Sequence, residues 1–153
     1  MKELIFKTDK NLSAIILRVV AGGLLFIHGL GKLGDGFETF MGYITYLGLP
    51  SIMGYLTIVI EILGSLLLIA GIATRINAGV IFGLFVGMII TVHGQFGLMM
   101  NWFGQMEAGQ EGFEYHLLVL AMTAALVIQG GGALSFDLGI WRKVNFNEDQ
   151  DKL

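Results

Sequence analysis

The chain has 153 residues, enough for one domain, of which 55% are hydrophobic and 14% charged. Soluble domains carry about 25% charged residues, so a soluble globular enzyme and a disordered chain are both disfavoured. The net charge of −3 offers no basic surface for nucleic acid, and the lack of cysteine excludes disulfides, thiolate nucleophiles and cysteine-ligated clusters. The 23 glycines beside a single proline are typical of close-packed membrane helices.

Four apolar stretches separate the charged residues and predict helices over residues 12–31, 52–72, 76–99 and 114–131. Each is close to the length of about 20 residues that a helix needs to cross a bilayer with its backbone groups paired. The sequence therefore predicts an all-α integral membrane protein. We expect a single four-helix transmembrane bundle within residues 1–139 and a tail over residues 140–153.

A shorter amphipathic stretch follows the first predicted span. Apolar residues recur at helical spacing between Gly36 and Leu49, beside Tyr43 and Tyr46. This pattern predicts a short helix in the membrane interface between spans 1 and 2.

The basic residues predict the orientation of the chain. An even number of spans places both termini on one side, and most of the Lys and Arg residues fall on that side. The positive-inside rule then predicts that both termini lie in the cytoplasm. We expect the protein in a bacterial inner (plasma) membrane. The basic residues on the terminal side are Lys2, Lys7, Lys10, Arg75, Arg142, Lys143 and Lys152, against Lys32 alone on the other.

Two charged residues fall inside the predicted spans, Arg18 in the first and Glu61 near the middle of the second. A charge at such a depth costs about 2.5 kcal/mol or more, so we expect Arg18 and Glu61 to form a buried polar pair. Two interpretations stay open: the pair locks the helices together, or Glu61 carries protons or contacts a polar ligand. A third is that Arg18 snorkels to the inner surface and leaves Glu61 protonated.

All three histidines fall at the outer end of the predicted bundle, where Lys32 and Glu114 join them. We expect a ligand-binding or proton-handling site there, with no catalytic residue assigned. Two of the imidazoles could ligate a haem, and three, or two with Glu114, could bind Zn, Cu or Fe. A His and a Glu could hydrogen-bond the carbonyls of a quinone and move its protons. The alternative is that these histidines only cap helix ends and meet water. The histidines, which are also the candidate metal ligands, are His28, His93 and His116.

A run of glycines follows one face of the third predicted span, at Gly79, Gly83 and Gly87. In lipid, helices associate where small residues let their backbones approach closely. The run therefore predicts a packing face, against another helix of the chain or against a partner subunit.

Several short motifs occur in an order that resembles the DoxX family of small four-helix membrane proteins, over about residues 12–139. The motifs are Arg18 to Gly23, His28-Gly-x-Gly-Lys32, Phe40 with Leu47-Gly-Leu-Pro50, Glu61-x-x-Gly64, Gly71-x-x-Thr-Arg75, His93, Glu114-Tyr115 and Gly130 to Asp137.

The resemblance implies membrane redox work beside a partner protein, without a set of catalytic residues to carry over. We therefore predict a membrane subunit of a quinone-linked oxidoreductase, with haem or metal as open alternatives to quinone. The expected partners are the lipid bilayer, a membrane or periplasmic redox protein and further copies of the chain, and not nucleic acid. The competing hypotheses are a non-catalytic membrane anchor or assembly factor, and a small-solute or proton transporter that uses Glu61.

Overall fold

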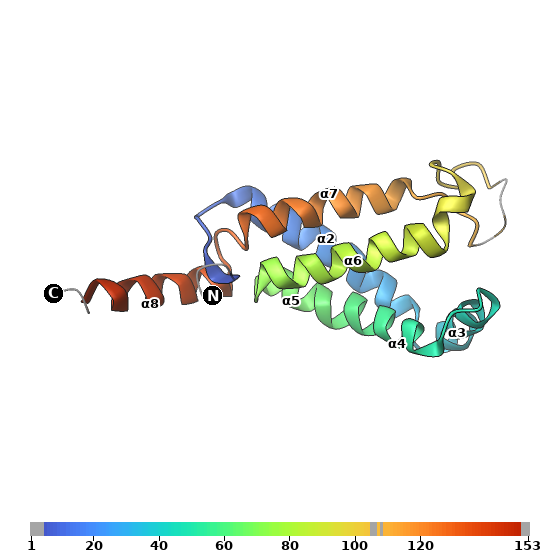
Figure 1. Ribbon diagram of the computed structural model, residues 1–153, viewed down its shortest axis with the longest axis horizontal. Coiled ribbons are helices and arrows are strands. Elements are labelled where there is room, and N and C mark those ends of the chain that lie inside the picture. The colour runs from blue at the N-terminus through green and yellow to red at the C-terminus, as the bar shows by residue number, and fades with distance from the viewer. Residues whose placement is uncertain (1–4, 105–106, 108, 151–153) are drawn as a thin grey trace.

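The computed structural model describes residues 5–104, 107 and 109–150, and all regular structure in that part of the chain is helical. Four helical segments lie side by side (Figure 1). The second segment consists of two α-helices joined by one π-helical turn. The four segments are α2 (Leu12–Gly31), α4 (Ser51–Val59) with η1 (Ile60–Gly64) and α5 (Ser65–Ala70), α6 (Thr74–Thr91), and α7 (Glu114–Gln129).

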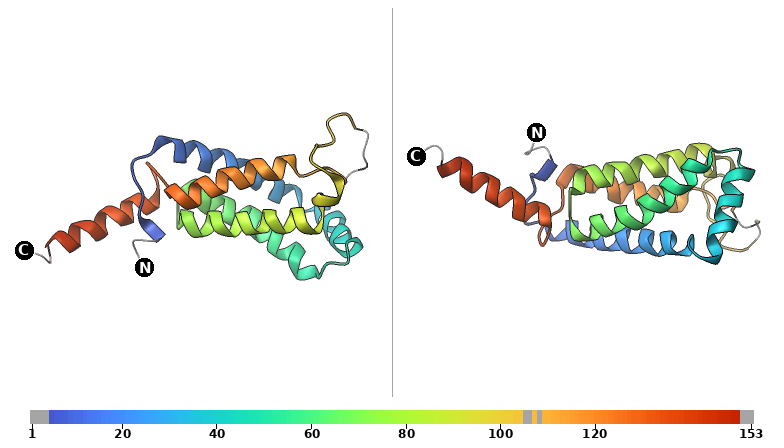
Figure 2. Two further views of the ribbon diagram at one scale, coloured as in Figure 1. Left: turned by 45° about the horizontal axis from the view of Figure 1, so that its top comes forward. Right: turned by 90° about the horizontal axis from the view of Figure 1, so that it is seen from below.

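Two further helices lie at opposite ends of these segments (Figures 1 and 2). α3 (Asp35–Tyr46) crosses one end, which we call the distal end, and α8 (Phe136–Gln150) extends from the other, the terminal end. The first and the last residues that the structure describes lie at the terminal end (Figure 1), as four antiparallel segments require. Which side of a membrane each end faces stays a prediction.

The predicted all-α membrane fold is confirmed. Three segments are long and apolar enough to cross a membrane, namely Leu12–Gly31, Ser51–Ala70 and Thr74–Thr91, and the fourth, Glu114–Gln129, is apolar but shorter. The third ends at Thr91 rather than at residue 99, because Val92 leaves helical geometry (φ −127°, ψ −67°). A 3-10 turn, η2 (His93–Phe96), follows it.

Two other segments differ from the prediction in their bounds. The expected interfacial helix forms as α3 and ends at Tyr46, before Gly48, whose positive φ of 70° favours glycine. The predicted tail is mostly helical, since α8 runs without a break across residue 139. Residues 151–153 of that tail lie outside the described part of the chain.

Glycines on α2 bring it into close contact with the second segment. A Cβ atom added at Gly22 would lie 2.6 Å from Cγ1 of Ile69 and 2.9 Å from the backbone oxygen of Ser65. One added at Gly29 would lie 3.1 Å from Cβ of Glu61. The two backbones therefore approach as closely as small residues allow in lipid.

Polar side chains join the helix ends at the terminal end. The buried guanidinium of Arg18 donates to the backbone oxygen of Ile69 (2.6 Å) and to that of Ala133 (3.1 Å). The carboxylate of Asp137, on α8, accepts from the backbone N–H groups of Ala73 (2.7 Å) and Thr74 (2.8 Å) where α6 begins. Helix ends leave such groups unpaired, and these bonds pair four backbone groups at the terminal end, although Nε of Arg18 and the Thr74 hydroxyl are buried there without a partner among the described residues.

We predict that Gly22→Ala lowers the midpoint of thermal unfolding in detergent, measured by circular dichroism. The added methyl overpacks a tight contact, at a cost of about 1–3 kcal/mol. Gly23→Ala is the matched control, because nothing lies within 4 Å of a Cβ atom at Gly23. Equal midpoints for the two variants would contradict the close approach of α2 and α5.

Candidate functional site

The distal half of the bundle contains a cavity of about 540 Å³, within the usual range for small-molecule sites. α4 diverges from α6 toward the distal end (Figure 1 and the left view of Figure 2), and both helices line the cavity. Most of the lining is apolar. Ten of the lining residues carry polar side chains, namely His28, Lys32, Tyr43, Thr57, Glu61, Thr91, His93, Glu111, Tyr115 and His116.

An ion pair lies in the wall of this distal cavity. The ammonium of Lys32 donates to Oε2 of Glu61 at 2.6 Å. The side chain of Glu61 is only 4% exposed and that of Lys32 is 19% exposed. The expected pair between Arg18 and Glu61 is therefore wrong, since Arg18 bonds to backbone oxygens at the terminal end instead.

The direction in which helical side chains lean explains this pairing. Every Cα–Cβ bond in an α-helix tilts toward the helix N-terminus. α2 starts at the terminal end, so Arg18 leans away from the bundle centre and Lys32 leans back into it. The second segment runs the opposite way, so Glu61 leans distally, toward Lys32.

Glu61 lies in the π-turn η1, which side chains hold in place. The amide of Asn77, on α6, donates to the backbone oxygen of Gly64 at 2.5 Å. The hydroxyl of Ser65 donates to the backbone oxygen of Ile62 at 2.8 Å. π-turns inside α-helices are rare and occur frequently at functional sites.

A row of aromatic and imidazole rings also lines the cavity. His28 stacks on Tyr115 with ring centres 5.4 Å apart, and His116 lies 6.0 Å from Tyr115. His93 lies 4.2 Å from His116 and has its Nδ1 2.7 Å from the backbone oxygen of Glu111. The structure thus brings the three histidines and Lys32 to one cavity, as their positions in the sequence led us to expect.

Two polar atoms in this row lack a partner. Within the described residues, the Tyr115 hydroxyl and Nδ1 of His116 are buried and have no hydrogen-bond partner. Buried polar groups in proteins are nearly always paired. The two atoms therefore mark a place where a ligand or an ordered water supplies the missing bonds.

Glu114 does not join the site, although it is adjacent to Tyr115 in the chain. Its carboxylate accepts from the indole N–H of Trp102 (3.0 Å) and from the backbone N–H of Met100 (3.4 Å). It holds the loop that precedes α7 instead of lining the cavity. The acidic residues that line the cavity with the histidines are Glu61 and Glu111.

The described part of the chain has no cluster of three His, Cys, Asp or Glu residues that could hold a metal ion. The three-histidine metal site that we considered from the sequence is thus not formed there. His28 is stacked on Tyr115, while His93 and His116 pair with each other.

Glycines on α6 provide space for the cavity. Gly83 and Gly87 both line it, and nothing lies within 4 Å of a Cβ atom added at either. Their predicted role in packing against another helix of the chain is therefore wrong. Gly79, one turn earlier, makes only an ordinary contact with Val127, at 4.0 Å.

α3 is attached to the loop on the far side of the cavity. The hydroxyl of Tyr43 donates to the backbone oxygen of Gly109 at 3.1 Å, and Phe40 and Leu47 of the same segment line the cavity. Burial raises the pKa of the Tyr43 phenol, with Glu111 adding to the effect. Tyr43 therefore stays protonated, and able to donate this bond, well above neutral pH.

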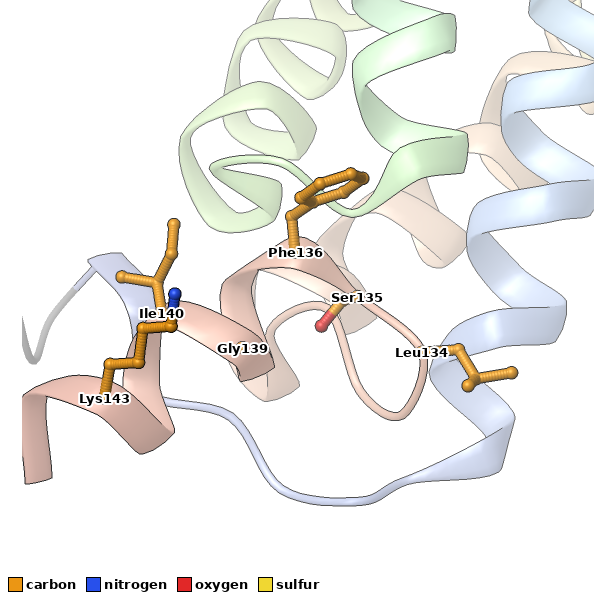
Figure 3. A pocket seen from close by; sticks show the side chains of 6 residues that line it. All are labelled: Leu134, Ser135, Phe136, Gly139, Ile140 and Lys143. Carbon is orange, nitrogen blue, oxygen red and sulfur yellow. The ribbon is translucent and has the colours of Figure 1, made fainter. Parts of the chain in front are cut away.

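A smaller hollow of about 360 Å³ lies where α8 begins. The side chains of Leu134 and Phe136 project in different directions from the turn before α8 and from its start (Figure 3). Lys143 is the one ionisable group among its lining residues. We therefore place the candidate site in the distal cavity.

We predict that Lys32→Met lowers the free energy of unfolding by about 3 kcal/mol, because removing one partner leaves a buried charge uncompensated. Lys10→Met is the control, since Lys10 is exposed near the N-terminus. The double variant Lys32→Gln, Glu61→Gln should recover most of the loss, because no charge is left unpaired. Unfolding in detergent measures all three, and equal stability of Lys32→Met and Lys10→Met would contradict the ion pair.

Comparison with known proteins agrees with the sequence motifs. A family model described as DoxX matches residues 13–94, which include Lys32, Glu61 and Asn77 but not Tyr115 or His116. A protein of Bacillus subtilis (strain 168) named "Putative oxidoreductase CatD" is 38% identical over 117 residues, which cover 76% of this chain and 79% of that protein. No solved structure matches the chain. The chain belongs to the DoxX family of membrane proteins.

Proposed function

We propose that this chain is the quinone-binding membrane subunit of an oxidoreductase, and that the distal cavity holds the quinone headgroup. The name of the Bacillus subtilis relative supports a redox role. The membrane location supports a ligand that is soluble in lipid. The observation that carries the proposal is the pair of unpartnered polar atoms, at Tyr115 and His116, in a cavity that is otherwise mostly apolar.

The cavity offers the donors that a quinone needs. Quinone carbonyls only accept hydrogen bonds, and the Tyr115 hydroxyl and the Lys32 ammonium are both donors. Nδ1 of His116 donates as well when that nitrogen carries the proton. The apolar remainder of the lining suits an aromatic ring, and small-molecule sites typically combine such a lining with a few polar groups.

A bound quinone supplies two-electron, two-proton chemistry, with the electrons exchanged with a flavin or metal cofactor of a partner oxidoreductase. The residues of this chain position the ring and manage its protons. Lys32 and Tyr115 fix the carbonyl oxygens, while Gly83 and Gly87 leave the room that the ring occupies. Thiol chemistry belongs to the partner, since this chain has no cysteine.

We predict that Gly83→Leu and Gly87→Leu each weaken quinone binding about tenfold or more, a loss of about 1.4 kcal/mol. Each new side chain fills the cavity without meeting other atoms at its Cβ position. The measurement is equilibrium dialysis of a short-tailed quinone against the purified protein in detergent.

Gly79→Leu is the matched control, because Gly79 lies on the same helix but outside the cavity lining. We expect it to bind as the wild type does, and all three variants to elute as the wild type does in gel filtration. A wild-type protein that takes up no quinone beyond the detergent blank would refute the proposal. If the Gly83 and Gly87 variants bind quinone as tightly as the wild type does, the quinone does not bind in this cavity.

A further inference from the structure

The Lys32–Glu61 pair connects the buried cavity with the distal surface. We propose that Glu61 takes up and returns a ligand proton, that Lys32 passes it between Glu61 and the water at the distal end, and that Asn77 is a positioning residue for Glu61. This inference rests on the proposed function, since it assigns a role at the same site.

The exposed fraction of the side chain increases from Glu61, at the cavity, to Lys32, toward the distal surface. Glu61 is 4% exposed and lines the cavity, while Lys32 is 19% exposed and caps the distal end of α2. Their 2.6 Å separation is that of a strong charge-assisted hydrogen bond. The ammonium also lies 3.3 Å from the backbone oxygen of His28. A proton on the pair is thus in contact with the cavity at one end and with the surface at the other.

Stability alone is a weak reason for such a pair. Two buried charges repay their desolvation cost only with excellent geometry, and apolar residues of similar volume often serve as well. Ionisable residues inside membrane helices are accordingly functional by default. Glu61 also borders a cavity that contains unpartnered polar atoms, which a purely structural pair would not require.

The π-turn orients Glu61 toward this cavity. The turn spans Ile60–Gly64. Two of its backbone oxygens accept hydrogen bonds from side chains outside the turn, those of Asn77 and Ser65. Asn77 is buried on α6, and its amide is the only one of these two donors that lies on another helix. α6 therefore fixes the turn, and through it the carboxylate, relative to the cavity wall that α6 also forms.

An apolar layer separates the pair from the terminal end. Leu25, Leu68 and Ile81 are each at most 1% exposed and belong to one buried cluster. Leu25 follows Arg18 on α2 and Leu68 follows Glu61 in the second segment, so both lie between the two charged residues, and Ile81 packs from α6 beside Gly64. The ionisable groups that interact with Glu61 are Lys32 and His28 of α2 and Tyr115 of α7. Proton exchange is therefore directed to the distal end.

Oxidation of a bound hydroquinone releases two protons and two electrons. One ligand O–H bond breaks and an O–H bond forms at Glu61, while the second hydroxyl gives its proton to the neutral imidazole of His116. Two electrons pass to the oxidised flavin or metal cofactor of the partner oxidoreductase. Lys32, released from the neutralised carboxyl group, gives one ammonium proton to the distal water, returns as a neutral amine and takes the proton from Glu61, which restores the ion pair. Reduction of the ligand reverses each transfer.

Infrared difference spectroscopy, reduced minus oxidised, tests this on the purified protein with a bound short-tailed quinone. We expect a carboxylic acid band that shifts in D₂O in the wild type and is lost in Glu61→Gln. Glu38→Gln is the control, because Glu38 is an exposed carboxylate on α3, and it should keep the band. Asn77→Ala should bind quinone with at most a small loss of affinity but shift or weaken the band, which a role in packing alone would not do.

The outcomes separate this inference from the proposed function. Quinone binding by the wild type without any band that depends on Glu61 would overturn the proton role and leave the binding role intact. No binding by the wild type would overturn both. If Glu61→Gln fails to fold or to bind, Glu61→Asp decides, because it keeps both the charge of the pair and Lys32. A carboxylic acid band at the wild-type frequency in Glu61→Asp overturns the inference, and a band that moves or disappears with quinone bound supports it.

Discussion

A carboxylate in the middle of a membrane helix needs a partner, and in this protein the partner is Lys32. The 2.6 Å contact with Glu61 is possible because Lys32, at the last turn of α2, leans back toward the bundle centre while Glu61 leans to meet it. The contact also needs Gly29, where a side chain would press on Glu61 itself. Gly29, Lys32 and the π-turn that contains Glu61 thus depend on one another for the ion pair. The distal cavity borders this pair.

The bundle has two halves that differ in polarity and packing. In the terminal half, Arg18 and Asp137 pair with the backbone groups of helix ends, and the small residues of α2 pack tightly against α5. In the distal half, α4 diverges from α6 and glycines leave space unfilled. A transporter would need a route past the buried Arg18 and the apolar layer above it. The closed terminal half therefore favours a ligand site with one open end.

Hydropathy predicts most of this fold, because the cost of unpaired backbone groups in lipid fixes the length of each span. Topology then predicts that His28, His93 and His116 lie at one end, since their positions near helix ends suffice for that. The side-chain partners are harder to predict. The helical rise per residue gives the depth of a Cα atom but not the direction in which the side chain leans. A prediction from depth alone therefore paired Glu61 with Arg18 and missed Lys32.

The remaining differences have similar causes. Glu114 lies beside Tyr115 in the chain, but its carboxylate turns to the loop because free N–H groups are available there. Tyr115 resembles an ordinary interfacial aromatic until its ring is found stacked on His28 and edge-on to His116. The π-turn depends on a donor from another helix, Asn77, which no local pattern reveals. Gly83 has the spacing of a packing residue, and only the divergence of α4 shows that it lines a cavity.

Photoaffinity labelling with an azido-quinone tests the central claim most directly, on the protein reconstituted in lipid vesicles and mapped by mass spectrometry. We expect label on α6 between Gly83 and Thr91 and at the start of α7. An excess of unlabelled short-tailed quinone should prevent this labelling. Label spread over exposed apolar positions such as Ile16 and Leu118, and not displaced by that excess, would contradict it.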